Sequence, residues 1–199
     1  MPNWCYTNIV IEGDKKDVET LNDAMEKLEN MNQPFEPNGF GKTWLGNLVV
    51  YFGGDWNKIR CRGEWMDRDF DNGCLSFNAD HAWAPPIETL EFLKEKFPSF
   101  KIYWQSEEPG MCEYWTNDAN HVYFHDKFYL EMCTVDDHYY HEYFEDEESL
   151  VDYVNKHLGL NISSAKDLAE VSDKWEEEYD GAYIFAHEFL VDESDKLLL

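Results

Sequence analysis

The chain has little positive charge. Only 16 Lys and Arg stand against 42 Asp and Glu, which gives a formal net charge of -26 over 199 residues. Binding to nucleic acid or to an anionic membrane surface depends on neutralising phosphate charge, so this composition argues against both. The chain also lacks an apolar run approaching the ~20 residues of a membrane span. We therefore expect no direct nucleic-acid ligand and no membrane contact.

Secretion signals and paired cysteines are also missing. The N-terminal segment has neither a basic stretch nor a long apolar core, so it does not resemble a secretory signal. The five cysteines are odd in number, widely separated and without a CxxC motif. This pattern is typical of reduced thiols in a cytoplasmic protein, and we expect that location.

No pattern of residues indicates a metal or a catalytic centre. His121 and His125 would chelate an ion if they lay on a helix, but residues 120–125 are expected to form a strand, which would hold the two rings ~13 Å apart. Cys5 would need a histidine partner to act as a nucleophile, and its position in a strand directs it into the interior. We expect no catalytic residue, no metal and no cofactor.

Hydrophobic residues make up 43% of the chain and aromatic residues 17%, which is enough to build a core despite the charge. Alternation with period two predicts strands, and apolar residues at spacings of three and four predict helices. In chain order, we expect a strand at 3–12, a helix at 15–29, a loop at 30–47, strands at 58–66 and 75–79, a helix at 87–97 and a strand at 100–104. This β-α-β-β-α-β order predicts an α+β fold, a ferredoxin-like sandwich.

The remaining chain is expected to add strands and then a more acidic segment. Strand-like stretches at about 111–116, 120–125 and 127–135 are expected to extend the sheet as extra hairpin strands. Residues 136–199 carry 19 acidic and four basic side chains. We expect a ferredoxin-like domain with added strands at 1–135 and an acidic α/β extension at 136–199 packed on it.

Three separated blocks point to a family. They are Met1-Pro2-Asn3-Trp4-Cys5 followed by Asn8, then Trp83-Ala84-Pro85-Pro86-Ile87, and then Glu107-Glu108-Pro109-Gly110-Met111. In this order they resemble proteins with a YubB-type ferredoxin-like domain, over residues 1 to about 125. The resemblance implies the ferredoxin-like fold and an origin on a plasmid, phage or other mobile element. It implies no catalytic residues, and the acidic segment beyond residue 136 has no counterpart in it.

The acidic segment supplies the candidate binding residues. Clustered carboxylates repel one another, and they attract a positively charged partner at long range. Aromatic side chains beside them are expected to act as anchors for that partner. The candidates are Asp136, Asp137, Tyr139, Tyr140, Glu142, Tyr143, Phe144, Glu145, Asp146, Glu147, Glu148, Glu176, Glu177 and Glu178.

The function that we expect is that of a non-enzymatic acidic binding protein. As a nucleic-acid mimic, it would occupy the basic surface of a host nucleic-acid-binding protein or of a restriction or CRISPR-type defence protein. One alternative is a small-ligand or enzymatic module with a site between the sheet and the C-terminal extension. Another is a structural protein that forms a homodimer through an exposed sheet edge.

Overall fold

The computed structural model describes residues 2–37, 39–134, 138–192 and 196–198. In this part the protein is α+β, with five α-helices and two mainly antiparallel sheets. The chain forms two compact units. The first unit comprises residues 1–119 and 191–199, and the second comprises residues 120–190. None of the described helices would cross a lipid bilayer, because each is too short or too polar.

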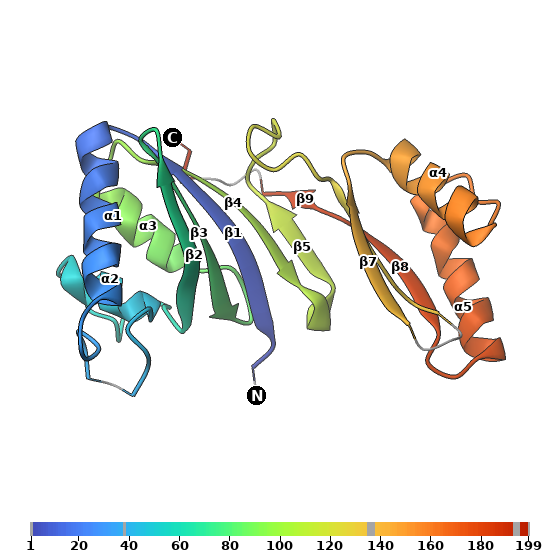
Figure 1. Ribbon diagram of the computed structural model, residues 1–199, viewed down its shortest axis with the longest axis horizontal. Coiled ribbons are helices and arrows are strands. Elements are labelled where there is room, and N and C mark those ends of the chain that lie inside the picture. Colours follow the sequence, from blue (N-terminus) through green and yellow to red (C-terminus); the bar gives the residue numbers. More distant parts are fainter. Residues whose placement is uncertain (1, 38, 135–137, 193–195, 199) are drawn as a thin grey trace. The chain divides into compact units, whose positions relative to one another are not determined.

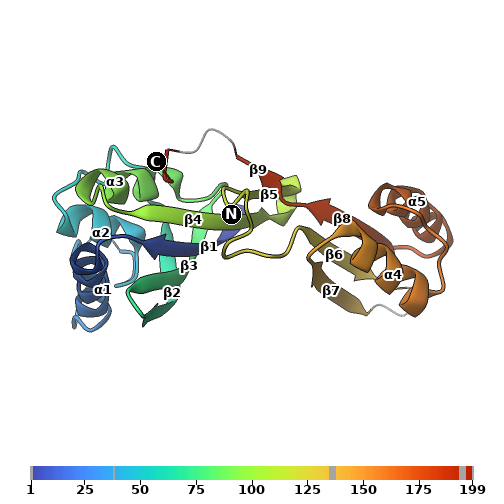
Figure 2. The ribbon, with the colours of Figure 1, turned by 90° about the horizontal axis from the view of Figure 1, so that it is seen from above.

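The first unit contains a six-stranded sheet and three helices (Figure 1). Its elements are β1 (Trp4–Glu12), α1 (Lys15–Glu29), α2 (Leu45–Tyr51), β2 (Gly63–Asp71), β3 (Cys74–Ala82), α3 (Ile87–Lys96), β4 (Lys101–Glu108), β5 (Glu113–Thr116) and β9 (Leu190–Val191). The strand order is β2-β3-β1-β4-β5-β9. β1 is paired with β3 on one side and with β4 on the other, and Figure 2 shows β1 and β4 side by side.

The first core lies between this sheet and its helices. Along β1, alternate side chains from Cys5 to Ile11 are buried. The apolar stripe of α1, which includes Leu21 and Met25, packs into the same cluster. Each such side chain contributes roughly 1.5–3 kcal/mol when it is fully buried. The other face of β1 carries half-buried and exposed side chains, so the sheet has one covered face and one open face.

A buried amide fixes the segment that precedes α2. The Asn47 side chain is fully buried and donates from Nδ2 to the carbonyls of Gly41 and Lys42, at 3.0 and 2.9 Å. Its Oδ1 accepts a hydrogen bond from the Glu36 backbone N–H at 3.0 Å. One side chain thus satisfies three backbone groups of a segment that has no regular structure of its own.

The second unit is a three-stranded sheet with two helices. Its elements are β6 (Phe128–Cys133), β7 (Tyr139–Phe144), α4 (Glu147–Leu158), α5 (Leu168–Glu178) and β8 (Tyr183–Glu188). β6 is the central strand, in the order β7-β6-β8. Its Leu130 and Met132 pack with residues of both helices, including Val154 and Leu168, in a separate second core.

Capping residues explain where the helices of the second unit begin and end. Asp146 accepts a hydrogen bond from the Ser149 N–H at 2.8 Å and caps α4, which ends at Gly159 with a φ of 66°. Ser164 and Asp167 form a capping box ahead of α5.

The units divide the chain at different positions from those that we expected. The boundary falls at 119/120 rather than 135/136, and residues 191–199 return to the first unit. The reason is that β6 does not extend the first sheet: its apolar side chains belong to the second core, between β7 and β8. Residues 120–125 form turns and bends and not the expected strand.

Replacement of Asn47 by Asp tests the anchoring of residues 36–42. An ionised carboxylate cannot donate, so two backbone carbonyls lose their donor and a charge is buried. We expect Asn47→Asp to lower the free energy of unfolding by about 2–4 kcal/mol, measured by urea denaturation. The matched control is Asn32→Asp at an exposed position, which should change it by less than about 0.5 kcal/mol. Equal effects of the two variants would contradict the assigned role.

Candidate functional site: the outer face of the second sheet

The register of the second sheet gathers rings on one face. Leu130 and Met132 of β6 face the helices, so the residues that alternate with them face outward. Pairing with β7 and β8 then defines three outward rows across the strands. They are Tyr143-Tyr129-His187, His141-Glu131-Phe185 and Tyr139-Cys133-Tyr183. In Figure 1, α4 and α5 lie on the other side of this sheet. We call this surface the outer face.

Tyr129 lies at the centre of the ring contacts. Its ring centroid is 5.0 Å from that of Tyr143, 6.0 Å from His141 and 6.3 Å from His187. Its hydroxyl is 3.0 Å from the hydroxyl of Tyr139. Burial raises the pKa of the Tyr129 phenol, and the hydrogen bond to Tyr139 raises it further. The phenol therefore stays neutral, and the buried ring lies beneath the more exposed rings around it.

A single carboxylate lies among these rings. Glu131 Oε1 is 3.1 Å from His187 Nε2, and its Oε2 accepts a long hydrogen bond of 3.5 Å from the Tyr139 hydroxyl. The Glu131 side chain is 18% exposed. Around it, Tyr139, Tyr143 and Phe185 are exposed by 53%, 38% and 43%. A ligand can therefore reach both the ring faces and the carboxylate.

Charge complementarity defines the ligand that suits this surface. The three outward rows contain no Lys or Arg. The second unit as a whole has four Lys and no Arg against 18 Asp and Glu. Tyr and Phe rings attract cations through their quadrupoles, and a partly buried carboxylate strengthens that attraction. The rings and the Glu131 carboxylate of the outer face can thus contact cationic groups.

The structure does not bring the predicted carboxylates into one patch. Residues 145–148 lie at the start of α4, beside the end of the sheet where Phe128 pairs with Phe144. Residues 176–178 lie at the end of α5, close in sequence to Tyr183, which pairs with Cys133 at the opposite end. A six-residue strand separates these ends by roughly 17–20 Å. All seven side chains are exposed, so the carboxylates flank the sheet at both ends.

Two of the predicted acidic residues have local structural roles. Asp146 caps α4, and Glu147 accepts a hydrogen bond from the Ala165 N–H at 2.9 Å. Carboxylates in a first helical turn are also stabilised by the helix dipole. Their positions therefore need no partner to explain them, unlike those of Glu176, Glu177 and Glu178 at the C-terminal end of α5.

The predicted aromatic anchors separate into different environments. Tyr139 and Tyr143 belong to the outer face, whereas Tyr140 points to the helix side of β7 and is half exposed. Phe144 is buried in the second core against Tyr153, so the expectation that it is a surface anchor is wrong. Glu142 lies on the helix side of β7 and is exposed. Asp136 and Asp137 lie outside the described residues.

Sequence reasoning missed most of the outer face, because only Tyr139 and Tyr143 were among the candidates. Tyr129 and Glu131 on β6, and Phe185 and His187 on β8, were not among the candidates. The signal was present, because Tyr129 and Glu131 alternate with Leu130 and Met132. Their importance depends on the pairing of β6 with β7, which follows it directly, and with β8, about 50 residues later in the chain, and no local pattern reveals the second pairing.

Cys5 and the histidine opposite it do not form a reactive pair. Cys5 lies opposite His81 in the register of β1 and β3. Burial raises the pKa of Cys5 to about 11 and lowers that of His81, so both are neutral near pH 7. A thiol in that state is a poor nucleophile. Among the residues that the structure describes, no cluster of three or more His, Cys, Asp or Glu is arranged to hold a metal ion.

Comparison with protein-family models, curated proteins and solved structures finds no match to this chain. The resemblance to the YubB-type family stays a prediction from three short blocks. Any assignment of function must therefore start from the site itself.

The α4 cap predicts a pH dependence of stability. Hydrogen bonds from the Ser149 N–H and side chain lower the pKa of Asp146 below its usual range. Its stabilising contribution is therefore present above pH ~4 and is lost as the pH falls through the folded-state pKa. Because Asn caps a helix without titrating, we expect Asp146→Asn to show a smaller fall in Tm between about pH 5 and pH 2.5 than the unmodified chain.

The matched control is Asp152→Asn, an exposed carboxylate within the same helix. Thermal unfolding followed by circular dichroism measures all three proteins. If Asp146→Asn retained the full acid-induced fall, or if Asp152→Asn reduced it equally, the cap would not be the titrating group.

Proposed function

We propose that this chain is a non-enzymatic binding protein whose second unit captures an Arg- and Lys-rich surface of a partner protein. The observation that carries the proposal is the outer face, where Tyr, His and Phe rings surround the Glu131 carboxylate without a Lys or Arg among them. Cation–π contacts contribute roughly 0.5–2 kcal/mol each, depending on desolvation. Several such contacts, together with the Glu131 carboxylate, would hold a bound partner at short range, in addition to the long-range electrostatic attraction.

The carboxylates at the two ends of the sheet support long-range recognition. A unit with 18 acidic and four basic side chains attracts a basic surface and speeds the encounter with it. Basic surfaces of this kind occur on proteins that handle nucleic acids. We propose that the partner is a nucleic-acid-binding or defence protein, and that the acidic unit competes as a mimic for the surface that would otherwise hold phosphates.

We also propose that the first unit is a ferredoxin-like domain. Four of its strands have the order β2-β3-β1-β4, with α1 following β1 and α3 following β3. This arrangement supports the YubB-type resemblance, although helix α2 and strands β5 and β9 are additions to it. The five cysteines are all free thiols, which suits a cytoplasmic protein.

Variants on the two faces of β7 test the proposed function. The probe is a short fluorescein-labelled peptide of alternating Arg and Gly, and fluorescence anisotropy measures its Kd for the full chain. We expect Tyr143→Ala, on the outer face, to raise this Kd about threefold to tenfold through the loss of a cation–π contact. Tyr140→Ala removes the same ring from the helix side of the same strand, and should change the Kd less than about twofold.

Two further controls define the outcome. A peptide with Ser in place of Arg should not bind, and sedimentation velocity should show whether the chain itself forms a homodimer through the edge of β7. Equal effects of the two Tyr variants, or no binding of the Arg peptide at low salt, would contradict the proposed function. A stable dimer in sedimentation velocity, together with no binding of the Arg peptide, would favour the self-assembly alternative.

A further inference from the structure

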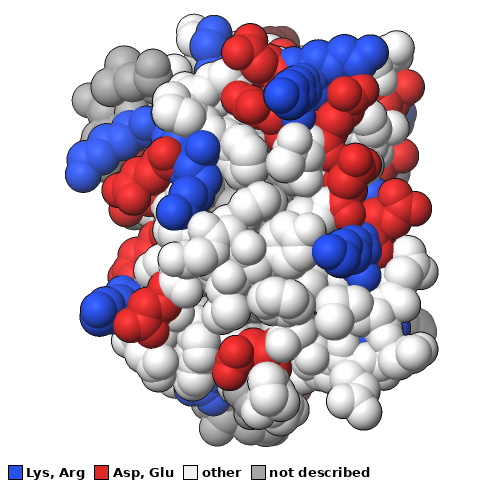
Figure 3. All heavy atoms as spheres, turned by 90° about the vertical axis from the view of Figure 1, so that its left-hand side faces the viewer, with Lys and Arg blue, Asp and Glu red and all other residues white. Residues whose placement is uncertain are grey.

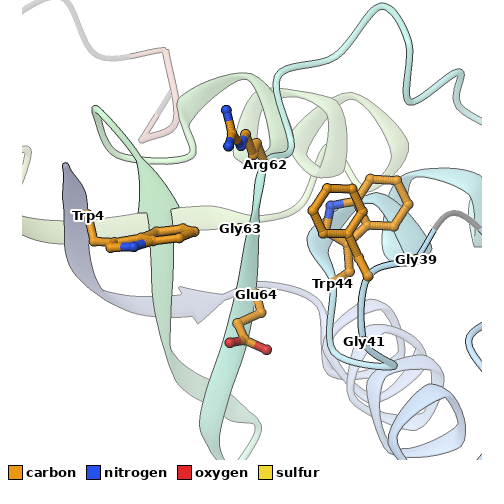
Figure 4. Close-up of a pocket in the computed structure, with 8 residues that line it drawn as sticks. Trp4, Gly39, Gly41, Trp44, Arg62, Gly63 and Glu64 are labelled. Carbon is orange, nitrogen blue, oxygen red and sulfur yellow. The ribbon is translucent and has the colours of Figure 1, made fainter. Parts of the chain in front are cut away.

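A separate cleft lies within the first unit. It has a volume of about 250 Å³ and is lined by Trp4, Gly39, Phe40, Gly41, Trp44, Arg62, Gly63 and Glu64. Pockets for drug-sized ligands are commonly larger, at about 300–1,000 Å³. The occupant that suits this cleft is therefore small. In Figure 4, Trp4 and Trp44 lie on opposite sides of Gly63, with Arg62 and Glu64 above and below.

A short side chain opposite Trp4 allows the Trp4 ring to form one side of the cleft. Trp4 begins β1 and is 50% exposed. Its partner across the strand pair is Ala82, and the Ala82 N–H in turn donates to the carbonyl of Arg62 at 2.9 Å. Because Ala82 is short, the Trp4 ring extends across β3 toward Gly63 (Figure 4). Gly63 admits no larger residue, since a Cβ there would overlap the Asp80 carbonyl oxygen.

The second wall is a stacked pair of rings. The Phe40 and Trp44 rings are 5.0 Å apart with an interplanar angle of 18°. Trp44 is held beside β2 by a bridge to Glu64. Asn47, through its bonds to Gly41 and Lys42, fixes the segment that carries Phe40. Trp4 and the Phe40–Trp44 pair therefore lie on opposite sides of the cleft. In Figure 4 the Trp4 ring is seen edge-on and Trp44 nearly face-on, so a flat ring that stacks on one of them meets the other edge to face.

Hydrogen-bonding groups project beside the walls. Arg62 immediately precedes β2 and Glu64 is the second residue of that strand, so in extended backbone both point to the same face, roughly 7 Å apart along the chain. Arg62 offers only donors and Glu64 only acceptors. Within the described residues, Arg62 has no hydrogen-bonding or ionic partner for its side chain, and Glu64 Oε2 takes one bond of 3.2 Å from Thr43. The Nε1–H of the buried Trp44 has no partner among the described residues either.

We propose that this cleft binds a guanine base. Guanine presents, along one edge, a carbonyl acceptor followed by two adjacent N–H donors. Arg62 can donate to the carbonyl oxygen O6 and to the acceptor nitrogen N7 beside it, and the Glu64 carboxylate can accept from the N1–H and the exocyclic N2–H groups. The ring stacks on the Phe40–Trp44 pair and meets Trp4 edge to face. A neutral base brings no phosphate, so the negative charge of the chain does not oppose it.

The same chemistry discriminates against other bases. Adenine offers one exocyclic amine and no second donor beside it, so Glu64 would lose one of two charged hydrogen bonds. Uracil and thymine place a single N–H between two carbonyls, one of which would face the carboxylate. Loss of a hydrogen bond to a charged group costs about 1.5–3 kcal/mol, or roughly tenfold to a hundredfold in Kd.

Isothermal titration of the full chain with nucleosides tests this inference. We expect guanosine to bind with a Kd below about 1 mM and at least about tenfold more tightly than adenosine or uridine. Guanosine 5′-monophosphate, in a parallel titration, determines whether a free base or a nucleotide is preferred. Glu64→Gln should weaken guanosine binding about tenfold, and Arg62→Met should weaken it similarly. Trp4→Ala should abolish most of the binding through the loss of one wall.

Matched variants outside the cleft are Glu95→Gln, on the exposed part of α3, and Trp115→Ala on β5, and both should leave binding unchanged. Equal affinity for adenosine and guanosine would overturn the assignment to guanine, as would tighter binding of free tryptophan. No heat with guanosine up to about 1 mM would overturn it as well. These results are independent of the Arg-peptide assay on the second unit.

Discussion

In β6, Leu130 and Met132 pack into the second core, whereas Tyr129, Glu131 and Cys133 point the other way. This alternation is the constraint on which the second unit depends, because a strand turns successive side chains to opposite faces. A shift of the register by one residue would expose the core and bury Glu131. Since the position of β6 between β7 and β8 fixes that register, core and outer face are determined together.

The same constraint produces the cleft in the first unit. Cys5 faces the covered side of β1, and Trp4, one residue earlier, faces the open side. On β2, Trp65 enters the first core while Glu64 faces outward, and Arg62, just before the strand, is exposed as well. The short side chain of Ala82 leaves room for the Trp4 ring beside the cleft. Charge also differs between the units: the first has 12 basic and 24 acidic residues, against four and 18 in the shorter second unit. The side of the first unit that bears α1, α2 and α3 carries residues of both signs (Figure 3).

Local patterns in the sequence predicted much of the fold. The range expected for α1 agrees with the structure, because helix periodicity depends on neighbouring residues. Features that depend on long-range pairing were missed. β7 was read as part of an acidic stretch, because its glutamate and histidine residues hide the alternation of its tyrosines. The first turn of helix α2, residues 45–47, was expected to be loop, since the anchoring by Asn47 is not visible in sequence. The tyrosines of β7 were recognised as candidates, but the partners of Tyr139 and Tyr143 on β6 and β8 were not.

The central claim is that the acidic second unit attracts a basic partner, and the salt dependence of association tests it most directly. Glu142, Glu145 and Glu148 are exposed, and together they can be changed to Gln. A matched variant changes Asp23 to Asn and Glu26 and Glu95 to Gln in the first unit, with the same change in net charge. Stopped-flow association with the Arg-Gly peptide, measured from low to high salt, compares the two variants. The account predicts slower association and a flatter salt dependence for the second-unit variant alone. If the association rate depended on salt concentration with the same slope for both variants and for the unmodified chain, this claim would be contradicted.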